Sequence, residues 1–144
     1  MKVLLDLNVL LDVIQKREPH FAASAAILSR IASGEIEGAV AAHALTTIHY
    51  LVARFASRGK ALEAVDWLLG ELEVVPASRE TFLRARGLGM SDFEDAVVAA
   101  TAEESGCDQV ATRNVGDFDD SPVPAISPGE LDAALAEPEP EPPE

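Results

Sequence analysis

This chain has little cysteine and no long apolar run, and each of these features excludes a class of protein. The 144 residues include one cysteine, Cys107, so no disulfide can form within the chain and a reducing compartment is expected. No apolar run reaches the roughly 20 residues of a membrane span, because Asp6, Asn8 and Asp12 interrupt the N-terminal one. We therefore expect a cytoplasmic protein with no membrane segment.

Basic residues are also few. Lysine and arginine total 11 against 25 acids, which gives a net charge of −14. This balance argues against binding nucleic acid through a basic surface that neutralises phosphates, but not against holding it through bound cations. Part of the acidity lies in the C-terminal "EPEPEPPE", whose alternating glutamates and prolines cannot form a packed helix or strand. The composition predicts one folded domain at residues 1–135 and a disordered acidic tail at 136–144.

Short buried-strand patterns alternate with helical patterns along the folded part. Strands are predicted at 2–6, 37–42, 72–77, 108–112 and 123–127, and helices at 8–14, 17–34, 43–55, 59–71, 78–89, 91–106 and 128–135. Asn8 is predicted to cap the first helix, and Ser91 with Glu94 forms a possible capping box for the sixth. This alternation predicts an α/β fold with a parallel sheet between two layers of helices.

Three aspartates stand where such a sheet binds ligands. Asp6 ends the first strand, Asp117 lies in "TRNVGDF" after the fourth, and Asp95 heads an apolar helical stripe, with Asp92 one turn earlier. If the first and fourth strands are neighbours, Asp6 and Asp117 face the same crevice. A carboxylate directed toward the core needs a cation or hydrogen-bond donors. With no cysteine pair and no zinc-like histidine spacing, the set suits Mg²⁺ or Mn²⁺ and therefore phosphate chemistry.

The chain resembles the PIN-domain ribonucleases, whose best-known members are the VapC-type toxins of bacterial toxin–antitoxin pairs. The resemblance spans about Lys2 to Leu131 and is carried by "LLDLNVLLD", by "DFEDAVVAATAEESGCDQVATRNVGDF" and by the order of the elements between them. It implies a three-layer α/β/α fold around a central parallel sheet of about five strands. It also implies a metal-dependent endoribonuclease that uses Mg²⁺ or Mn²⁺, an RNA substrate, an antitoxin partner that covers the acidic crevice, and a homodimer.

The resemblance assigns roles to individual residues. The catalytic and metal-binding acids would be Asp6, Asp95 and Asp117, and the supporting polar residues would be Asn8, Thr112 and Asn114. Asp92 is added from its position one turn before Asp95 on the same helix face, as a further ligand or only as a helix cap. The family usually carries a glutamate in the third helix, where "ALTTIHYLV" here has Thr47, although a related branch looks similar in lacking it. His49 lies near that helix face and is a weaker substitute for the missing acid.

Three arginines are candidates for RNA contacts. Arg54 and Arg58, together with Lys60, form a small basic patch that would suit phosphates, with a solvated helix end as the alternative. Arg113 would contact substrate or pair with a neighbouring acid.

Two other functions remain open from the sequence. The absent acid at Thr47 favours a PIN-fold module that binds RNA or protein and cleaves weakly or not at all. A phosphatase of the haloacid dehalogenase type would need Asp-x-Asp after the first strand, and Asn8 occupies the second of those positions.

Overall fold

The computed structural model describes residues 1–137 and 142–143. Most of the predicted tail, residues 138–141 and 144, lies outside the described residues. In the described part, five strands form one parallel sheet in the order β3-β2-β1-β4-β5. The strands are β1 (Lys2–Leu5), β2 (Glu37–Ala41), β3 (Glu73–Val75), β4 (Gln109–Ala111) and β5 (Ala125–Ile126).

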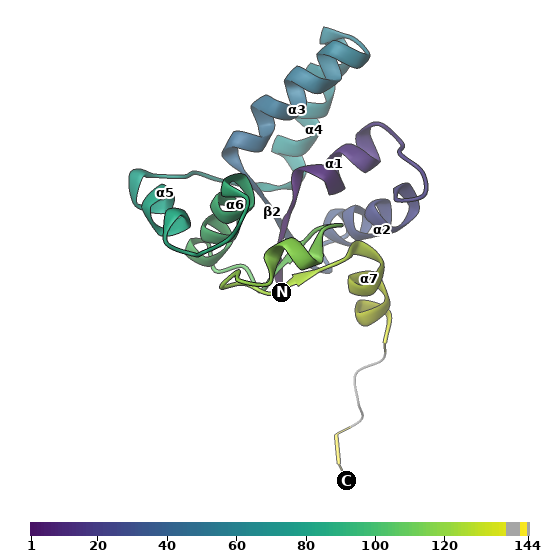
Figure 1. Cartoon of the computed structure of the whole chain (residues 1–144). Helices are drawn as coiled ribbons and strands as arrows, with labels where there is room; N and C mark the ends of the chain where they lie inside the picture. The colour runs from purple at the N-terminus through teal and green to yellow at the C-terminus, as the bar shows by residue number, and fades with distance from the viewer. Residues whose placement is uncertain (138–141, 144) are drawn as a thin grey trace.

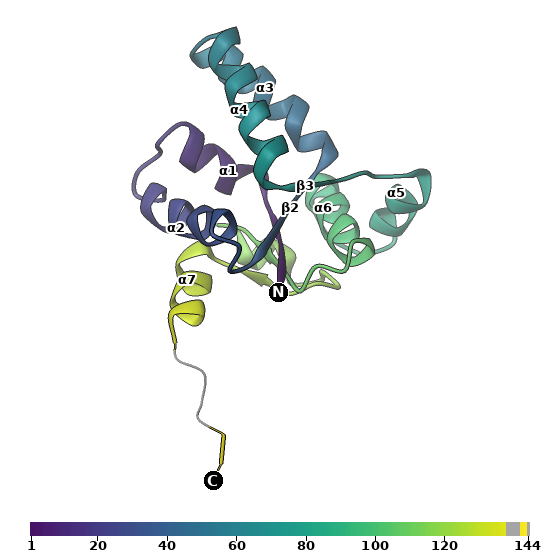
Figure 2. The same cartoon turned by 180° about the vertical axis from the view of Figure 1, so that it is seen from behind.

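Seven α-helices and one 3₁₀ helix connect the strands in this part of the chain. They are α1 (Leu7–Ile14), α2 (Phe21–Ala32), α3 (Ala42–Phe55), α4 (Arg58–Glu71), α5 (Arg79–Arg86), α6 (Phe93–Glu104), η1 (Val115–Phe118) and α7 (Pro128–Ala136). Figures 1 and 2 show α1, α2 and α7 on one side of the molecule and α5 with α6 on the other. None of these helices combines the length and the apolar character needed to cross a bilayer. The α/β fold with a parallel sheet between helical layers is confirmed.

The strands carry apolar side chains on both faces, which is why two helical layers can cover them. In β1, Val3 and Leu5 enter the core under α1 to α4 and α7, whereas Leu4 enters the core under α6. In β4, Val110 and Ala111 divide between the two cores in the same way. Alternation along a strand turns successive side chains to opposite faces, so a short run of apolar residues builds both cores at once.

The chain reverses its direction of travel across the sheet at β1. It moves outward from β1 to β2 and β3, then returns through α5 and α6 to place β4 on the other side of β1. The expected adjacency of the first and fourth strands is therefore confirmed. The Asp6 N–H extends the pairing by donating to the Ala111 carbonyl oxygen at 3.0 Å. Sheets of this kind bind ligands beyond the carboxyl ends of the strands at such a reversal.

Candidate active site

Asp6 ends β1, and both of its carboxylate oxygens accept hydrogen bonds. Oδ1 accepts from the Leu7 N–H at 2.8 Å, and Oδ2 accepts from the Thr112 hydroxyl at 2.9 Å. Asp6 is thereby the N-cap of α1, so the prediction that Asn8 caps this helix is wrong. The reason is local, since Asp6 has an extended backbone and brings an acceptor to the helix start two residues before Asn8, which lies in the first turn.

Thr112 connects the ends of β1 and β4. Its side chain is fully buried, and its Oγ1 donates to Asp6 while accepting from the Asn114 N–H at 3.1 Å. The Thr112 N–H donates to the Ile126 carbonyl oxygen at 3.0 Å, so the backbone at this position is held by the sheet edge. One hydroxyl thus holds the Asp6 carboxylate and the start of the "TRNVGDF" segment together.

The surroundings of Asp6 favour an arriving positive charge. Burial raises the pKa of Asp6, which is 5% exposed, while hydrogen bonds from Thr112 and Leu7 and the charge of Arg113 oppose that rise. The negative charge of Asp92 adds to it. A carboxylate that is buried and also faces another acid gains free energy when a cation binds beside it.

Asp92 begins α6. Its Oδ1 accepts from the Asp95 N–H at 2.9 Å, which makes Asp92 the N-cap. The alternative that Ser91 caps this helix with Glu94 at the third position is wrong, because the helix begins at Phe93 and Glu94 is its second residue. The cap orients the first turn of α6, and Asp95 stands in that turn.

The pKa of Asp95 shows which other acids lie near it. Burial raises the pKa of Asp95 from 3.8 to about 6, and the charges of Asp92, Asp6, Asp117 and Glu94 add to the rise in that order. Acids from β1, α6 and η1, far apart in the sequence, therefore lie within electrostatic reach of one another. Clusters of like charge that shift a pKa in this way are typical of functional sites.

The raised pKa of Asp95 predicts a pH-dependent gain in stability when its charge is removed. We expect Asp95→Asn to raise the free energy of unfolding of the metal-stripped protein above pH 6 by about 1 kcal/mol, after discounting for the solvent-exposed part of the carboxylate. The folded pKa lies above 3.8, so the wild type regains this stability as pH falls from 6 toward 4. Urea unfolding at pH 7.5 and pH 4 measures the difference, and a gain that persists unchanged at pH 4 would contradict the stated cause.

Asp117 is exposed on η1, the turn that closes the "TRNVGDF" segment. The Asp117 N–H donates to the Asn114 carbonyl oxygen at 3.0 Å, and the next residue, Phe118, is buried in the core under α6. Asn114 itself is exposed and makes no side-chain cap bond to η1. The buried Phe118 thus anchors the turn that carries Asp117 at the edge of the sheet.

The four acids suit a hard divalent cation by their chemistry. Carboxylate oxygens from Asp6, Asp92, Asp95 and Asp117 are the ligands that Mg²⁺ and Mn²⁺ prefer. Among the described residues, however, no three His, Cys, Asp or Glu side chains already form a cage around one point. Their mutual repulsion is visible in the raised pKa of Asp95, and a cation between them would relieve it.

Arg113 forms an ion pair with an acid that sequence reasoning left out of the site. Its Nε lies 2.9 Å from Oδ2 of Asp12, which has no solvent exposure, and the Arg113 side chain is 27% exposed. Neither Asp12 oxygen has a hydrogen bond of good geometry within the described chain. The pair joins α1 to the segment after β4. The positive charge of Arg113 also acts to lower the pKa of Asp6. A contact between Arg113 and RNA stays a prediction.

Thr47 occupies α3 where an acid was expected, and it makes only a local contact. Its hydroxyl donates to the His43 carbonyl oxygen at a long 3.5 Å. His43 is a residue that sequence reasoning missed: it follows β2 at the same edge of the sheet as Asp6, and its Nδ1 is buried without a hydrogen-bond partner in the described part of the chain. A histidine two residues after a buried strand was the available signal.

The basic patch of Arg54 and Arg58 lies apart from the acids. Arg54 lies in the last turn of α3 and Arg58 begins α4, at the tip of a hairpin that projects away from the sheet in Figures 1 and 2. The Arg54 guanidinium lies over the Phe55 ring at 5.9 Å and donates to the Tyr50 hydroxyl at 3.4 Å. Any role of this patch in binding RNA stays a prediction and would need a strand that reaches the hairpin tip.

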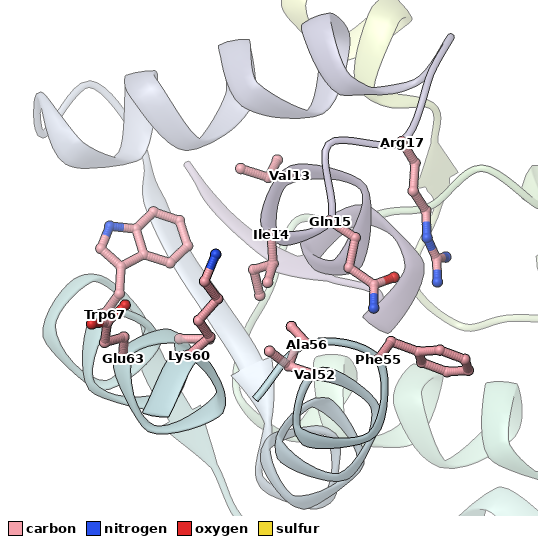
Figure 3. Close-up of a pocket in the computed structure, with 11 residues that line it drawn as sticks. Val13, Ile14, Gln15, Arg17, Val52, Phe55, Ala56, Lys60, Glu63 and Trp67 are labelled. Carbon is pink, nitrogen blue, oxygen red and sulfur yellow. The ribbon is translucent and has the colours of Figure 1, made fainter. Parts of the chain in front are cut away.

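A groove of about 810 Å³ lies between the end of α1 and the α3–α4 hairpin (Figure 3). Val13 and Ile14 of α1 lie opposite Lys60 and Trp67 of α4. None of the four acids lines this groove, so it is separate from the carboxylate cluster.

The sequence matches the family described as the PIN domain over residues 2–116, which is more than half of the chain. The chain belongs to the PIN-domain family. The resemblance inferred from its motifs is thereby confirmed. A search of curated proteins found no significant match.

Solved structures similar to this PIN domain share its fold at low sequence identity. VapBC2 from Rickettsia felis, bound to a DNA fragment from its promoter, has a TM-score of 0.67 at 17% identity, covering 88% of this chain and 98% of the other. FitAcB from Neisseria gonorrhoeae has a TM-score of 0.63 at 20% identity, with 88% and 97% covered. VapC20 from Mycobacterium tuberculosis, described as a sarcin-ricin loop cleaving toxin, has a TM-score of 0.59 at 15% identity, with 75% and 86% covered.

Proposed function

We propose that this PIN domain is a metal-dependent endoribonuclease. The observation that carries the proposal is the convergence of Asp6, Asp92, Asp95 and Asp117 where the chain reverses direction across the sheet, which raises the pKa of Asp95 to about 6. Membership of the PIN-domain family supports it, as does the description of the M. tuberculosis neighbour as a sarcin-ricin loop cleaving toxin. A cluster of acids in a chain of net charge −14 can bind an RNA phosphate only with a cation between them.

Each residue has a separate task in this proposal. Asp6, Asp95 and Asp117 would hold Mg²⁺ or Mn²⁺, and Asp92 would orient the first turn of α6 and add negative charge. A bound ion supplies positive charge to the phosphodiester and lowers the pKa of a water molecule. Thr112 and the Leu7 N–H hold Asp6 in a single orientation, so this ligand does not need to reorganise. Hydrolysis in this way needs no covalent nucleophile on the protein.

The proposal is tested by restoring metal to metal-stripped protein. With mixed-sequence single-stranded RNA, we expect no cleavage in the absence of divalent cations and cleavage that rises with added Mg²⁺ or Mn²⁺. Electrophoresis of the RNA fragments measures the rate. Cleavage at full rate without metal would overturn the metal requirement, and an intact RNA at saturating metal would overturn the enzymatic proposal.

We further propose that the protein acts in the cytoplasm as the toxin of a toxin–antitoxin pair and forms a homodimer. The toxin assignment is supported by a structural neighbour from Klebsiella pneumoniae with a TM-score of 0.66, which is described as a toxin–antitoxin complex. A small DNA-binding protein encoded directly upstream is expected to co-purify with this chain and to suppress its cleavage of RNA. Failure of that protein to bind would remove the toxin assignment and leave the nuclease proposal standing.

A second candidate function rests on Thr47. Because α3 contributes a hydroxyl bonded within its own helix and no carboxylate at this position, the acids that remain would hold one ion better than two. The loss of this acid therefore favours, as the second candidate, a PIN-fold module that binds RNA or protein and cleaves weakly. Metal binding through Asp6 without RNA cleavage would favour this module over the nuclease.

A further inference from the structure

Two exposed phenylalanines stand side by side next to the acids. Phe82 of α5 is 43% exposed and Phe93 of α6 is 52% exposed, and their ring centroids are 6.3 Å apart. The chain has five phenylalanines, one tyrosine and one tryptophan, so an exposed aromatic pair uses a scarce residue type. Large apolar groups left together on a surface commonly mark a binding site.

The position of Phe93 connects this pair to the carboxylate cluster. Phe93 is the first residue of α6 and lies between Asp92, the N-cap, and Asp95 in the first turn. The ring of Phe93 is directed to the surface, while the neighbouring acids interact with Asp6 and Asp117. The aromatic pair therefore borders the site where the proposed reaction takes place.

The same face of α5 carries positive charge that no ion pair within the described residues neutralises. Arg79, Phe82 and Arg86 follow one another at spacings of three and four, which places them on one side of the helix. Within the described residues neither Arg79 nor Arg86 has an ion-pair partner. Arg84 differs, because it donates to both carboxylate oxygens of Glu103, at 3.0 and 3.2 Å. Figures 1 and 2 place α5 on the outer side of α6, and Arg79, Phe82 and Arg86 are all exposed.

We propose that Arg79, Phe82, Arg86 and Phe93, here called the α5 aromatic face, bind single-stranded RNA next to the carboxylate site. An unpaired base would stack on the phenylalanine rings, and the flanking phosphates would contact the two arginines. Duplex RNA would not fit, because its bases are stacked on each other and not free to lie on a protein ring. This inference rests on the proposed nuclease function and adds the surface and the residues that would hold the RNA strand beside the acids.

The charges on the face argue against a second copy of the chain as its occupant. In a two-fold dimer the same surface meets itself, so the two arginines of each face would enter an interface to which this face contributes no carboxylate. An RNA strand instead supplies negative charge to both arginines and an aromatic partner to both rings. The two functions of the face, stacking and phosphate contact, are thus satisfied by one ligand.

The test measures RNA binding separately from cleavage. All variants are made in an Asp6→Asn background, so that a fluorescein-labelled 12-nucleotide single strand stays intact, and affinity is measured by fluorescence anisotropy with Mg²⁺ present. We expect Phe82→Leu and Phe93→Leu each to weaken binding about tenfold, because leucine keeps the apolar surface but removes the stacking face. Leu83→Ala, on the same helix and 55% exposed, is the matched control and should leave the affinity unchanged.

The arginines are tested by the salt dependence of binding. Arg86→Gln is expected to reduce the slope of log affinity against log salt by about 0.7, the value for one phosphate contact on a single strand. Arg84→Gln, from the paired arginine on the other side of α5, should leave the slope unchanged. A duplex of the same sequence is expected to bind more weakly than the single strand.

Three outcomes would overturn the inference. The first is that the aromatic variants bind the single strand as tightly as their parent, and the second is that the duplex binds as tightly as the single strand. The third is that both Phe82→Leu and Leu83→Ala halve the mass of the protein in sedimentation relative to the parent, which would make the face a protein interface. Cleavage by the wild-type protein, assayed in parallel, separates the two proposals. If the wild type cleaves RNA and the aromatic variants bind normally, only this inference fails; if the face binds RNA and the wild type does not cleave, only the nuclease proposal fails.

Discussion

Asp6→Asn is expected to abolish RNA cleavage, lowering the rate by about 100-fold or more, because even a partner of a metal ligand commonly contributes 10- to 100-fold. Asp6 is the acid held most firmly, with one oxygen on the Leu7 N–H and the other on the Thr112 hydroxyl. An amide keeps one of these acceptors but loses the negative charge that attracts the cation. We therefore also expect weaker Mg²⁺ binding, measured by calorimetry beside the cleavage rate.

The fold should tolerate this change. Asparagine is as good an N-cap as aspartate, and its amide nitrogen can donate to Thr112 Oγ1. Removing the charge also removes the cost of burial that raises the pKa of Asp6. Circular dichroism and thermal unfolding should match the wild type. Asp119→Asn is the control, since Asp119 is an exposed acid directly after the same segment and is not among the charges that raise the pKa of Asp95. Cleavage by Asp6→Asn at the rate of this control would remove Asp6 from the mechanism.

The largest loss of stability is expected from Arg113→Met. The substitution leaves Asp12, which has no solvent exposure, as a buried carboxylate without its cation. Breaking a buried pair from one side costs about 3–5 kcal/mol, and the lower end applies here because the Arg113 side chain is 27% exposed. The free energy of unfolding from urea denaturation should therefore fall by about 3 kcal/mol.

A double variant distinguishes the net contribution of the ion pair from the cost of leaving one of its charges unpaired. Asp12→Leu combined with Arg113→Met removes both charges, and we expect its stability to return to within about 1 kcal/mol of the wild type. Arg54→Met, at an exposed arginine on the α3–α4 tip, should change stability by less than about 0.5 kcal/mol. A loss for Arg113→Met no larger than this would mean that Asp12 does not depend on the ion pair.

The acids of the candidate site were predictable because of a general property of parallel sheets. The carboxyl ends of β1 and β4 share one edge, so Asp6, directly after β1, and Asp117, in the segment that follows β4, approach once the strands are neighbours. Asp95 was predictable because an acid at the head of an apolar stripe turns toward the core. Their roles in binding metal stay predictions until the Asp6→Asn and metal-restoration experiments are made.

The helix caps were not predicted correctly, and the errors have one cause. In both α1 and α6 an aspartate within two residues of the expected cap, Asp6 and Asp92, provides the capping oxygen instead. Asn, Ser and Asp are nearly equal as caps, so composition does not choose between neighbouring candidates. The choice depends on which residue the strand or loop leaves with an extended backbone, and that is set by tertiary contacts.

By itself the sequence determined the alternation of strands and helices, the family and the three acids, because these depend on the spacing and type of residues along the chain. Only the tertiary structure decided that Thr112 holds Asp6, that Asp12 is buried against Arg113, and that Phe82 and Phe93 share an exposed surface. Those properties depend on which distant segments meet. A hydroxyl, an arginine or a phenylalanine has the same local pattern whether its partner is water or a residue a hundred positions away.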